Sequence, residues 1–403
     1  MPLPTPFHSR TSPICKNQEW RNWSGFLAAV TYAPSHEHEY FSIRNSAGLI
    51  DVSPLYKYEF KGPDAVRLAN RAMTRNISQC KPGQIMYSPW CDENGKVIDD
   101  GTVSRIGPQH VRVTAADPSL RWFQDVGYGL DVTVDDVSGE LAALAIQGPN
   151  SRQILKQLVS GLDLDQLRYY WLAQGKIGDF SATITRTGYT GDLGFEIWVE
   201  PKHAEKLWDI LMETGVNFGI TPCGLAALDI ARIEAGLLLI DVDYISSNKA
   251  VLEEQKSSPF EIGLGWTVDL AKEDFIGKKA LIQEKKHGSK WRFIGLEIDW
   301  NSLETVYGKV NLPPQVAGRA SRNSLPIYKN GRQIGQATSI AFSPLLKKYI
   351  ALATVLTDYS SLGTLLNIEV TVEHHREIAS AKVVDSQFYN PPWKRDLPNV
   401  TKI

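Results

Sequence analysis

The segment Gly188–Val199 places the strongest constraint on how this chain folds. It reads Gly-Tyr-Thr-Gly-Asp-Leu-Gly-Phe-Glu-Ile-Trp-Val, so a glycine-rich turn runs directly into an alternating apolar strand. Because successive strand residues point to opposite faces, Phe195 and Ile197 are predicted to face one way and Glu196 the other. A carboxylate at that position needs hydrogen-bond donors around it. The alternative is an edge strand that carries a solvated glutamate, and the local sequence leaves both open.

A second segment carries an unusual pair of acids. Residues 83–88 and 96–105 read as two strands joined by a polar turn at Asp92–Gly95. Asp99 and Asp100 interrupt the second strand, although aspartate is depleted in strands. If the pleat holds, one of the two must point inward, where a carboxylate can accept a proton or stabilise a cation. The alternative is a loop with two solvated acids.

Composition excludes several classes of function. The 403 residues are 43% hydrophobic and carry a net charge of -2, so two or three domains and no broad nucleic-acid-binding field are expected. No run approaches the roughly 20 apolar residues of a membrane span. Histidines and cysteines show no metal-binding spacing, and we expect no metal. The cysteines are widely spaced, which favours reduced thiols and a cytoplasmic location; they are Cys15, Cys80, Cys91 and Cys223.

The order of predicted elements indicates an α+β fold. Strands and helices alternate with short loops through the first part of the chain, and one strand is predicted over 177–187. Beyond Ser289 short strands dominate, with turn signals such as Asn330-Gly331 between them, which is typical of a small β-barrel. We therefore predict a core of two lobes over residues 1–288 and a C-terminal barrel domain over 289–403. Neither a hydrolase nucleophile elbow nor a dinucleotide-binding glycine motif is present.

At this point the motifs resemble a known family, the T-protein (aminomethyltransferase) of the glycine cleavage system and its tetrahydrofolate-dependent relatives. The resemblance runs nearly end to end, in the family's order. It is carried by Ala47–Ser53, Val97–Asp100, Ala145–Pro149, Tyr189–Ile197, Pro222–Leu225, Arg232–Gly236, Gly263–Trp266, Asp274–Gly277, Gly335–Ser339 and Phe342–Pro344.

The resemblance implies a three-lobed cloverleaf with a folate-binding mixed-sheet core and a small C-terminal barrel. It also implies that Glu196 binds the pterin through two adjacent N–H donors, and that Asp100 is catalytic, near N5 and the transferring carbon. Asp99 is the less favoured acid, because the family carries the role on the second one. The further predicted folate-binding residues are Tyr87, Thr102, Arg232 and Trp266.

Three of these further residues have a structural alternative. Tyr87 and Trp266 are equally compatible with core packing, and Arg232 with a structural salt bridge near Glu234. Tyr32 and Tyr244 are weak candidates for a donor pocket, since an aromatic ring can face a methylated cation. Ordinary packing is the favoured alternative for both of these residues.

Departures from the family pattern fall at positions that face the donor. Pro54 replaces a histidine, Gly101 follows the acid pair, Thr114 replaces an asparagine, and Asp192 replaces a glutamate. These changes favour a demethylase or methyltransferase that passes a methyl or methylene unit from a small N-, S- or O-methylated compound to tetrahydrofolate. The alternatives are the glycine cleavage T-protein itself, which needs a lipoylated carrier protein as partner, and a non-catalytic folate-binding protein.

Overall fold

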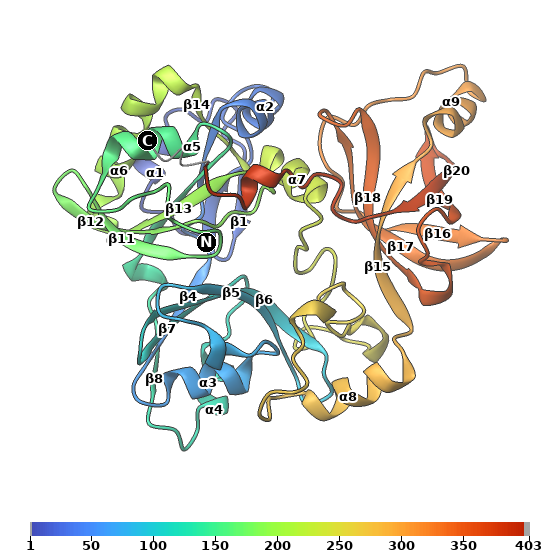
Figure 1. Cartoon of the computed structure of the whole chain (residues 1–403). Coiled ribbons are helices and arrows are strands. Elements are labelled where there is room, and N and C mark those ends of the chain that lie inside the picture. The colour runs from blue at the N-terminus through green and yellow to red at the C-terminus, as the bar shows by residue number, and fades with distance from the viewer. Residues whose placement is uncertain (1, 399–403) are drawn as a thin grey trace. The chain divides into compact units, whose positions relative to one another are not determined.

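The computed structural model describes residues 2–398, and the chain divides into two compact units (Figure 1). Of the described residues, unit 1 comprises 2–88, 100–231 and 390–398. Unit 2 comprises residues 89–99 and 232–389. The predicted α+β class is confirmed, with mixed sheets in one unit and a closed barrel in the other. The three-lobed arrangement and the domain boundary at residue 288 stay predictions.

A seven-stranded mixed sheet forms the centre of unit 1, in the order β10-β11-β12-β13-β9-β3-β14. Its strands are β10 (Val159–Ser160), β11 (Leu172–Ile177), β12 (Phe180–Thr185), β13 (Gly194–Val199), β9 (Ala142–Gln147), β3 (Ala47–Asp51) and β14 (Ile220–Pro222). Helices α5 (Ser151–Leu158) and α6 (Ala204–Gly215) pack on one face, where their leucine and isoleucine side chains join the apolar positions of the strands. The apolar face of this sheet is therefore the main core of unit 1.

The prediction of a single strand over 177–187 is wrong at its start. The structure has a hairpin instead, in which β11 and β12 meet at the pair Ile177 and Phe180. Gly178, with φ of 59°, and Asp179 form its two-residue turn, and glycine allows the left-handed backbone at the first position. The predicted pairing of the following strand holds, because Thr185 of β12 lies opposite Glu196 of β13.

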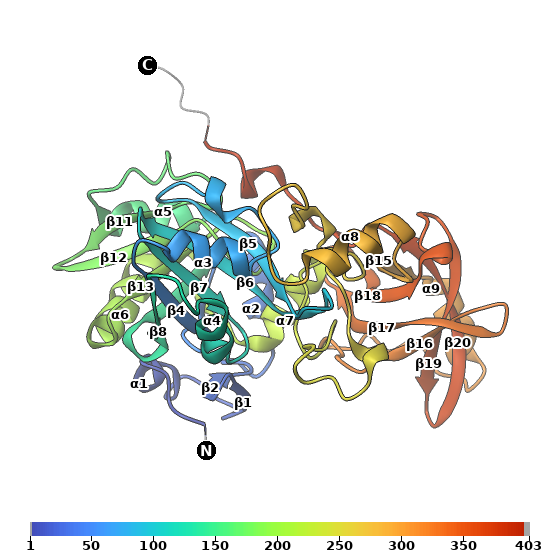
Figure 2. The same cartoon turned by 90° about the horizontal axis from the view of Figure 1, so that it is seen from below.

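A five-stranded sheet, ordered β5-β6-β7-β4-β8, forms the second layer of unit 1 apart from the tip of its first hairpin. Its strands are β5 (Ile85–Cys91), β6 (Val97–Gly107), β7 (His110–Ala115), β4 (Tyr56–Lys61) and β8 (Thr133–Asp136). Helices α3 (Ala65–Ala72) and α4 (Leu120–Val126) lie against it, as Figure 2 shows. The helices bury Leu68 and Phe123 completely, so this sheet is also covered on one face.

The remaining elements of unit 1 are short. They are α1 (His8–Thr11), the two-stranded sheet of β1 (Trp20–Trp23) and β2 (Phe26–Ala29), α2 (Glu37–Asn45) and α7 (Leu225–Glu234), which crosses into unit 2. Phe7, just before α1, is fully buried in the core of the seven-stranded sheet. The N-terminal segment is thereby attached to the core by an apolar side chain.

Unit 2 contains a closed six-stranded barrel in the order β15-β18-β17-β16-β19-β20. Its strands are β15 (Trp291–Ile298), β18 (Lys348–Leu356), β17 (Arg332–Ser343), β16 (Leu325–Lys329), β19 (Leu365–Val372) and β20 (His375–Val384). The predicted turn at Asn330-Gly331 joins β16 to β17, and both residues have positive φ, 51° and 75°. Two helices that the sequence pattern did not predict, α8 (Lys278–His287) and α9 (Trp300–Gly308), also belong to this unit.

Gly101 of β6 is required by the close approach of β7. A Cβ atom at this position would lie 1.9 Å from the backbone oxygen of Thr114. We expect Gly101→Ala to destabilise the protein by about 1–3 kcal/mol, as overpacking against backbone does. Urea unfolding followed by circular dichroism measures the change. Gly107→Ala, on the same strand but 3.8 Å from its nearest neighbour, is the matched control, and equal stability of the two variants would contradict the prediction.

Candidate functional site

Strand β13 holds Glu196 on the face opposite the core. Phe195 and Ile197 are fully buried in the core cluster, whereas Glu196 is partly buried on the other side, which confirms the predicted alternation. The edge-strand alternative is wrong, because β13 lies between β12 and β9 and pairs with both. The Glu196 carboxylate is therefore fixed on an interior strand of the sheet, where it is only partly exposed to water.

The surroundings of Glu196 supply too few donors for a carboxylate. Burial raises its pKa to about 7, and the side chains of Thr187, Trp198 and Thr185 offset only part of that rise. The Thr185 hydroxyl lies 3.5 Å from Oε2, at the limit of a hydrogen bond. The indole N–H of Trp198 is buried and makes no well-formed hydrogen bond. An added ligand with adjacent N–H groups would satisfy the carboxylate better than the protein does.

The pleat of β6 separates the two aspartates. Asp99 is fully buried, and its Oδ1 lies 3.5 Å from the hydroxyl of Tyr244. Asp100 is partly buried on the other face, where the Tyr87 hydroxyl donates to its Oδ2 at 2.5 Å. Burial, followed by the negative charge of Asp100, raises the pKa of Tyr87 well above its usual value, so Tyr87 stays a donor. Tyr87 and Asp100 thus form one polar pair across the β5–β6 hairpin.

One tyrosine that the sequence reasoning missed connects Asp100 with Glu196, and a second interacts with Tyr87. Tyr170 interacts electrostatically with both carboxylates, and burial is the main cause of its strongly raised pKa. Tyr170 and Tyr189 also both interact with Tyr87. Tyr189 stands inside the glycine-rich motif, so the sequence could have identified it as a site residue. Tyr170 has no such signal beyond its place in an aromatic run.

The backbone of Tyr170 adopts an unusual conformation. Its φ is 60°, in the left-handed region that costs a non-glycine residue about 1–2 kcal/mol. The conformation is held by two hydrogen bonds, from its N–H to the Arg186 oxygen at 3.0 Å and from the Ile85 N–H to its own oxygen at 2.8 Å. The second bond ties it to β5, the strand of Tyr87. A strained residue held between two acidic side chains is an arrangement found at functional sites.

Thr102 lies on β6 and is bound to β7 through Thr114. The two hydroxyl oxygens are 2.7 Å apart, and the Thr102 N–H donates to the Thr114 oxygen at 3.1 Å. The threonine that stands at the family's asparagine position therefore has its hydroxyl occupied within the sheet. A contact between Thr102 and folate stays a prediction.

Arg232 and Trp266 both belong to unit 2, and they lie in opposite environments. Arg232 is fully buried, and its guanidinium donates to Asp243 at 2.6 Å and to Ser339 at 2.8 Å. These contacts match the structural alternative, with Asp243 rather than the neighbourhood of Glu234 as the partner. Trp266 is 64% exposed, so core packing is the wrong alternative for it. Binding of folate by either residue stays a prediction.

The two weak donor-pocket candidates are both buried. Tyr32 is 7% exposed and packs with Cys15 and Ala29, and its backbone N–H donates to Glu39 at 2.7 Å. Tyr244 is 3% exposed and faces Asp99. The surroundings of Tyr32 match ordinary packing. Those of Tyr244 place its hydroxyl beside an acid that is next in sequence to Asp100.

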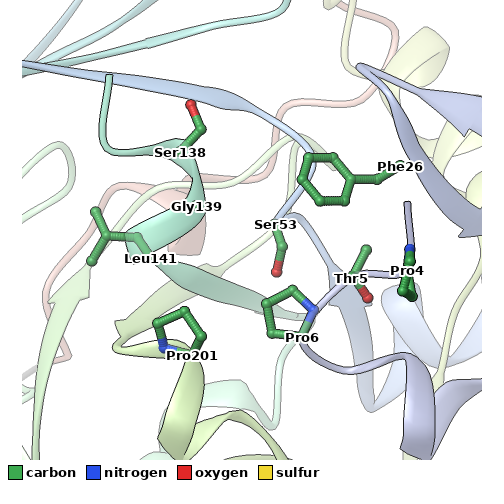
Figure 3. Close-up of a pocket in the computed structure, with 9 residues that line it drawn as sticks. All are labelled: Pro4, Thr5, Pro6, Phe26, Ser53, Ser138, Gly139, Leu141 and Pro201. Carbon is green, nitrogen blue, oxygen red and sulfur yellow. The ribbon is translucent and has the colours of Figure 1, made fainter. Parts of the chain in front are cut away.

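A pocket of about 300 Å³ lies elsewhere in unit 1, beneath the N-terminal segment (Figure 3). Its lining consists of Pro4, Thr5, Pro6, Phe26, Ser53, Ser138, Gly139, Leu141 and Pro201. None of the predicted site residues contributes to this lining. The pocket is therefore distinct from the cluster formed by Asp100, Glu196 and the three tyrosines.

Other kinds of site receive no support from the described residues. Within residues 2–398, no group of three or more histidine, cysteine or acidic side chains is arranged to hold a metal ion. All four cysteines are buried and free of disulfides. No helix in that range is long and apolar enough to cross a membrane.

Comparison with known proteins assigns both halves of the chain. The GCVT N-terminal domain model matches residues 14–272, and the glycine cleavage T-protein C-terminal barrel domain model matches residues 310–390. An aminomethyltransferase of Desulfitobacterium hafniense is 34% identical over 372 residues, which are 91% of this chain and 93% of that protein. A trimethylamine-oxide aldolase of Ruegeria pomeroyi is also 34% identical, over 97% of this chain but 47% of the relative.

The fold agrees with these matches. The crystal structure of glycine cleavage system aminomethyltransferase T from Bartonella henselae has a TM-score of 0.81, 23% identity, and coverage of 97% of this chain and 99% of that one. Core and barrel together define a folate-dependent one-carbon transferase. The chain belongs to the glycine cleavage T-protein family, which uses tetrahydrofolate as co-substrate.

The raised pKa of Glu196 predicts that deprotonation of this side chain lowers the folding stability of the ligand-free protein. Its folded-state pKa of about 7 exceeds the usual 4.5, so folding stability falls as pH rises between these values. We expect Glu196→Gln to have a higher Tm than the native protein at pH 8, by an amount corresponding to about 1–3 kcal/mol, and a similar Tm at pH 5. Glu213→Gln, at an exposed position of α6, is the control. If the Tm difference between Glu196→Gln and the native protein were no larger at pH 8 than at pH 5, the raised pKa of Glu196 would be refuted.

Proposed function

We propose that this protein transfers a one-carbon unit from a small compound to tetrahydrofolate without a carrier protein. The unit is a methyl group from an N-, S- or O-methylated donor, or a methylene group from a donor that is already at the oxidation level of formaldehyde. The observation that carries the proposal is the pairing of two unlike carboxylates in one cluster. Glu196 lacks strong donors, and Asp100 is held by Tyr87 and linked to Glu196 through Tyr170. Such a pair suits a ligand with N–H groups at one end and developing positive charge nearby.

In this proposal Glu196 orients the acceptor. Its two oxygens accept two adjacent N–H groups of the pterin, which replaces the solvation that burial removes. Tyr170 and Tyr189 provide aromatic surface in the same cluster. Positioning of this kind is worth several kcal/mol for a reaction between two substrates, because it removes the entropy cost of bringing them together.

Asp100 manages charge at the reacting centre. Tetrahydrofolate supplies the N5 nucleophile that accepts the one-carbon unit. When N5 forms a bond to the methyl carbon of a cationic donor, the carbon–heteroatom bond breaks and the heteroatom keeps its electron pair. N5 then releases its proton, which needs an acceptor. Asp100 is partly buried and is oriented by the hydrogen bond from Tyr87, so its carboxylate is suited to stabilise the cationic donor and to take that proton.

The substitutions near β6 and β3 favour a free donor over a carrier-bound one. Pro54 is buried and has no polar side chain, Gly101 lies against the Thr114 carbonyl, and the Thr114 hydroxyl is bound to Thr102. Pro54 thus lacks the polar side chain of the histidine that the T-protein carries, and the Thr114 hydroxyl is committed within the sheet. The relative named trimethylamine-oxide aldolase supports a small amine-type donor. The relatives named aminomethyltransferase support the alternative, in which an aminomethyl group arrives on a lipoylated carrier.

A donor screen tests the proposal directly. The full chain is mixed with tetrahydrofolate and a panel of small N-, S- and O-methylated compounds, and 5-methyl- and 5,10-methylene-tetrahydrofolate are measured by mass. We expect one donor class to react in the absence of any carrier. Product formation only when a lipoylated aminomethyl carrier is added would restore the glycine cleavage role. Folate binding with no transfer from any donor would favour the non-catalytic alternative.

Two variants should separate binding from turnover. We expect Glu196→Gln to weaken tetrahydrofolate binding about 10–100-fold in titration calorimetry, since a hydrogen bond to a charged group contributes about 1.5–3 kcal/mol. We expect Asp100→Asn to change that affinity little but to lower kcat and kcat/KM together, about 100-fold or more. Asp99→Asn is the neighbouring comparison. A severe defect in Asp99→Asn with a mild one in Asp100→Asn would reverse the catalytic assignment.

A further inference from the structure

Trp198 lies on the same strand and the same face as Glu196. Both residues belong to β13, and Ile197 between them points into the core cluster, so Glu196 and Trp198 share the opposite face. Residues two positions apart on a strand are separated by about 7 Å, so a carboxylate on a long side chain and an indole ring can meet there. Trp198 is 5% exposed, and this meeting therefore takes place away from bulk water.

The indole N–H of Trp198 is a buried donor. Among residues 2–398 it has no well-formed acceptor, and a buried donor without one is costly. Burial raises the pKa of Glu196 to about 7, and Trp198 is one of the hydrogen-bonding side chains that lower it. The Glu196 carboxylate is thus an acceptor within reach of the indole.

The other groups that face Glu196 leave room for this donor. Thr185 of β12 lies opposite Glu196, and its hydroxyl is 3.5 Å from Oε2 but only 2.5 Å from the Thr187 hydroxyl. On the other side, β9 places the apolar Ala145 opposite Glu196. Tyr170 interacts with Glu196 electrostatically, and burial raises its pKa, so its phenol stays protonated. The neighbouring strands therefore do not fix the carboxylate by themselves.

A cation lies over the same indole. The Lys57 Nζ is 5.8 Å from the centre of the Trp198 ring, within the range of a cation–π contact. Lys57 is fully buried on β4, where its ammonium donates to the backbone oxygens of Ser53 and Leu55 at 2.6 and 2.7 Å. Burial lowers its pKa to about 8, and Asp51 offsets part of this, so Lys57 is largely charged at neutral pH. A positive charge over an indole polarises the ring and makes its N–H a stronger donor.

We propose that Trp198 is a positioning residue for Glu196, whose ionised carboxylate accepts the indole N–H and is thereby held in the orientation that binds the pterin. The inference rests on the proposed function and adds to it a residue that does not itself touch the ligand. A carboxylate has about four lone-pair sites on its two oxygens. One site taken by the indole leaves each oxygen free to accept one of the two adjacent N–H groups of the pterin.

Donation by the indole depends on the charge of Glu196. A hydrogen bond to an ionised acceptor is roughly twice as strong as one between neutral groups. When Glu196 is protonated, the indole N–H loses this acceptor, and when Glu196 is ionised both groups are satisfied. The ionisation of Glu196 and the surroundings of the Trp198 N–H are therefore linked even before a ligand binds.

Nuclear magnetic resonance of the ligand-free full chain tests this link. The chain has eleven tryptophans, and the indole N–H signal of Trp198 is the one that Trp198→Phe lacks. Between pH 5 and pH 9 we expect this signal to move downfield with a midpoint near 7, the pKa to which burial raises Glu196. The movement should be absent in Glu196→Gln. A Trp198 signal that does not move, or that moves equally in Glu196→Gln, would overturn the inference.

Titration calorimetry with tetrahydrofolate tests the consequence for binding. Trp198→Phe keeps an aromatic ring and removes the N–H, so we expect binding about tenfold weaker at pH 7, the scale of a hydrogen bond to a charged group. In the Glu196→Gln background the same change should matter less than about twofold, because the charged acceptor is gone. The pH at which binding reaches half its maximum should also rise in Trp198→Phe, since the ionised carboxylate has lost a donor.

Trp208→Phe is the matched control. Trp208 is also 5% exposed, but it packs in the core cluster, and its replacement should change neither the affinity nor the pH midpoint. A loss of affinity in Trp198→Phe that is equally large with and without the Glu196 carboxylate would indicate a packing role. That result would overturn the inference and leave the proposed function standing. Failure of tetrahydrofolate to bind the native protein would overturn the proposed function and the role of Trp198 in folate binding together.

Discussion

The partly buried carboxylate of Glu196 is the group on which the candidate site depends. It stands in an interior strand whose other face is the main core of unit 1, so its position is fixed by the packing of Phe195 and Ile197. Burial there raises its pKa to about 7. A protein that tolerates such a group without strong donors retains an unsatisfied acceptor, and that acceptor defines what the site can bind.

The tyrosines connect this acceptor with the second acid and with the end of the chain. Tyr170 is held in a left-handed conformation by backbone bonds to Ile85 and Arg186. Arg186 also binds the C-terminal segment, so one buried guanidinium fixes two parts of the site region. A residue with no direct contact to the carboxylates thus determines where several of their neighbours lie.

Buried charged residues in this protein serve two different purposes. Arg232 and Asp243 form a fully buried ion pair, to which the hydroxyls of Ser339 and Thr338 add hydrogen bonds within unit 2. Glu196 is partly buried and Lys394 is buried, and each has few partners. Sequence motifs alone did not distinguish the two cases, because Arg232 and Glu196 both stand in motifs shared with the family. The number of hydrogen bonds to each charged group does distinguish them.

The sequence by itself determined the fold class, the alternation on β13, the hairpin turn of the barrel and the family. These follow from periodicity, from the φ requirements of Asn330-Gly331, and from motifs in a fixed order. Only the tertiary structure decided that Asp99 and Asp100 face different partners, that Arg232 is paired with Asp243, and that Tyr170 joins the acids. It alone brought Lys394 to Tyr169, more than two hundred residues away in sequence. Local patterns specify which face a side chain takes, whereas its partners come from distant segments that only packing brings together.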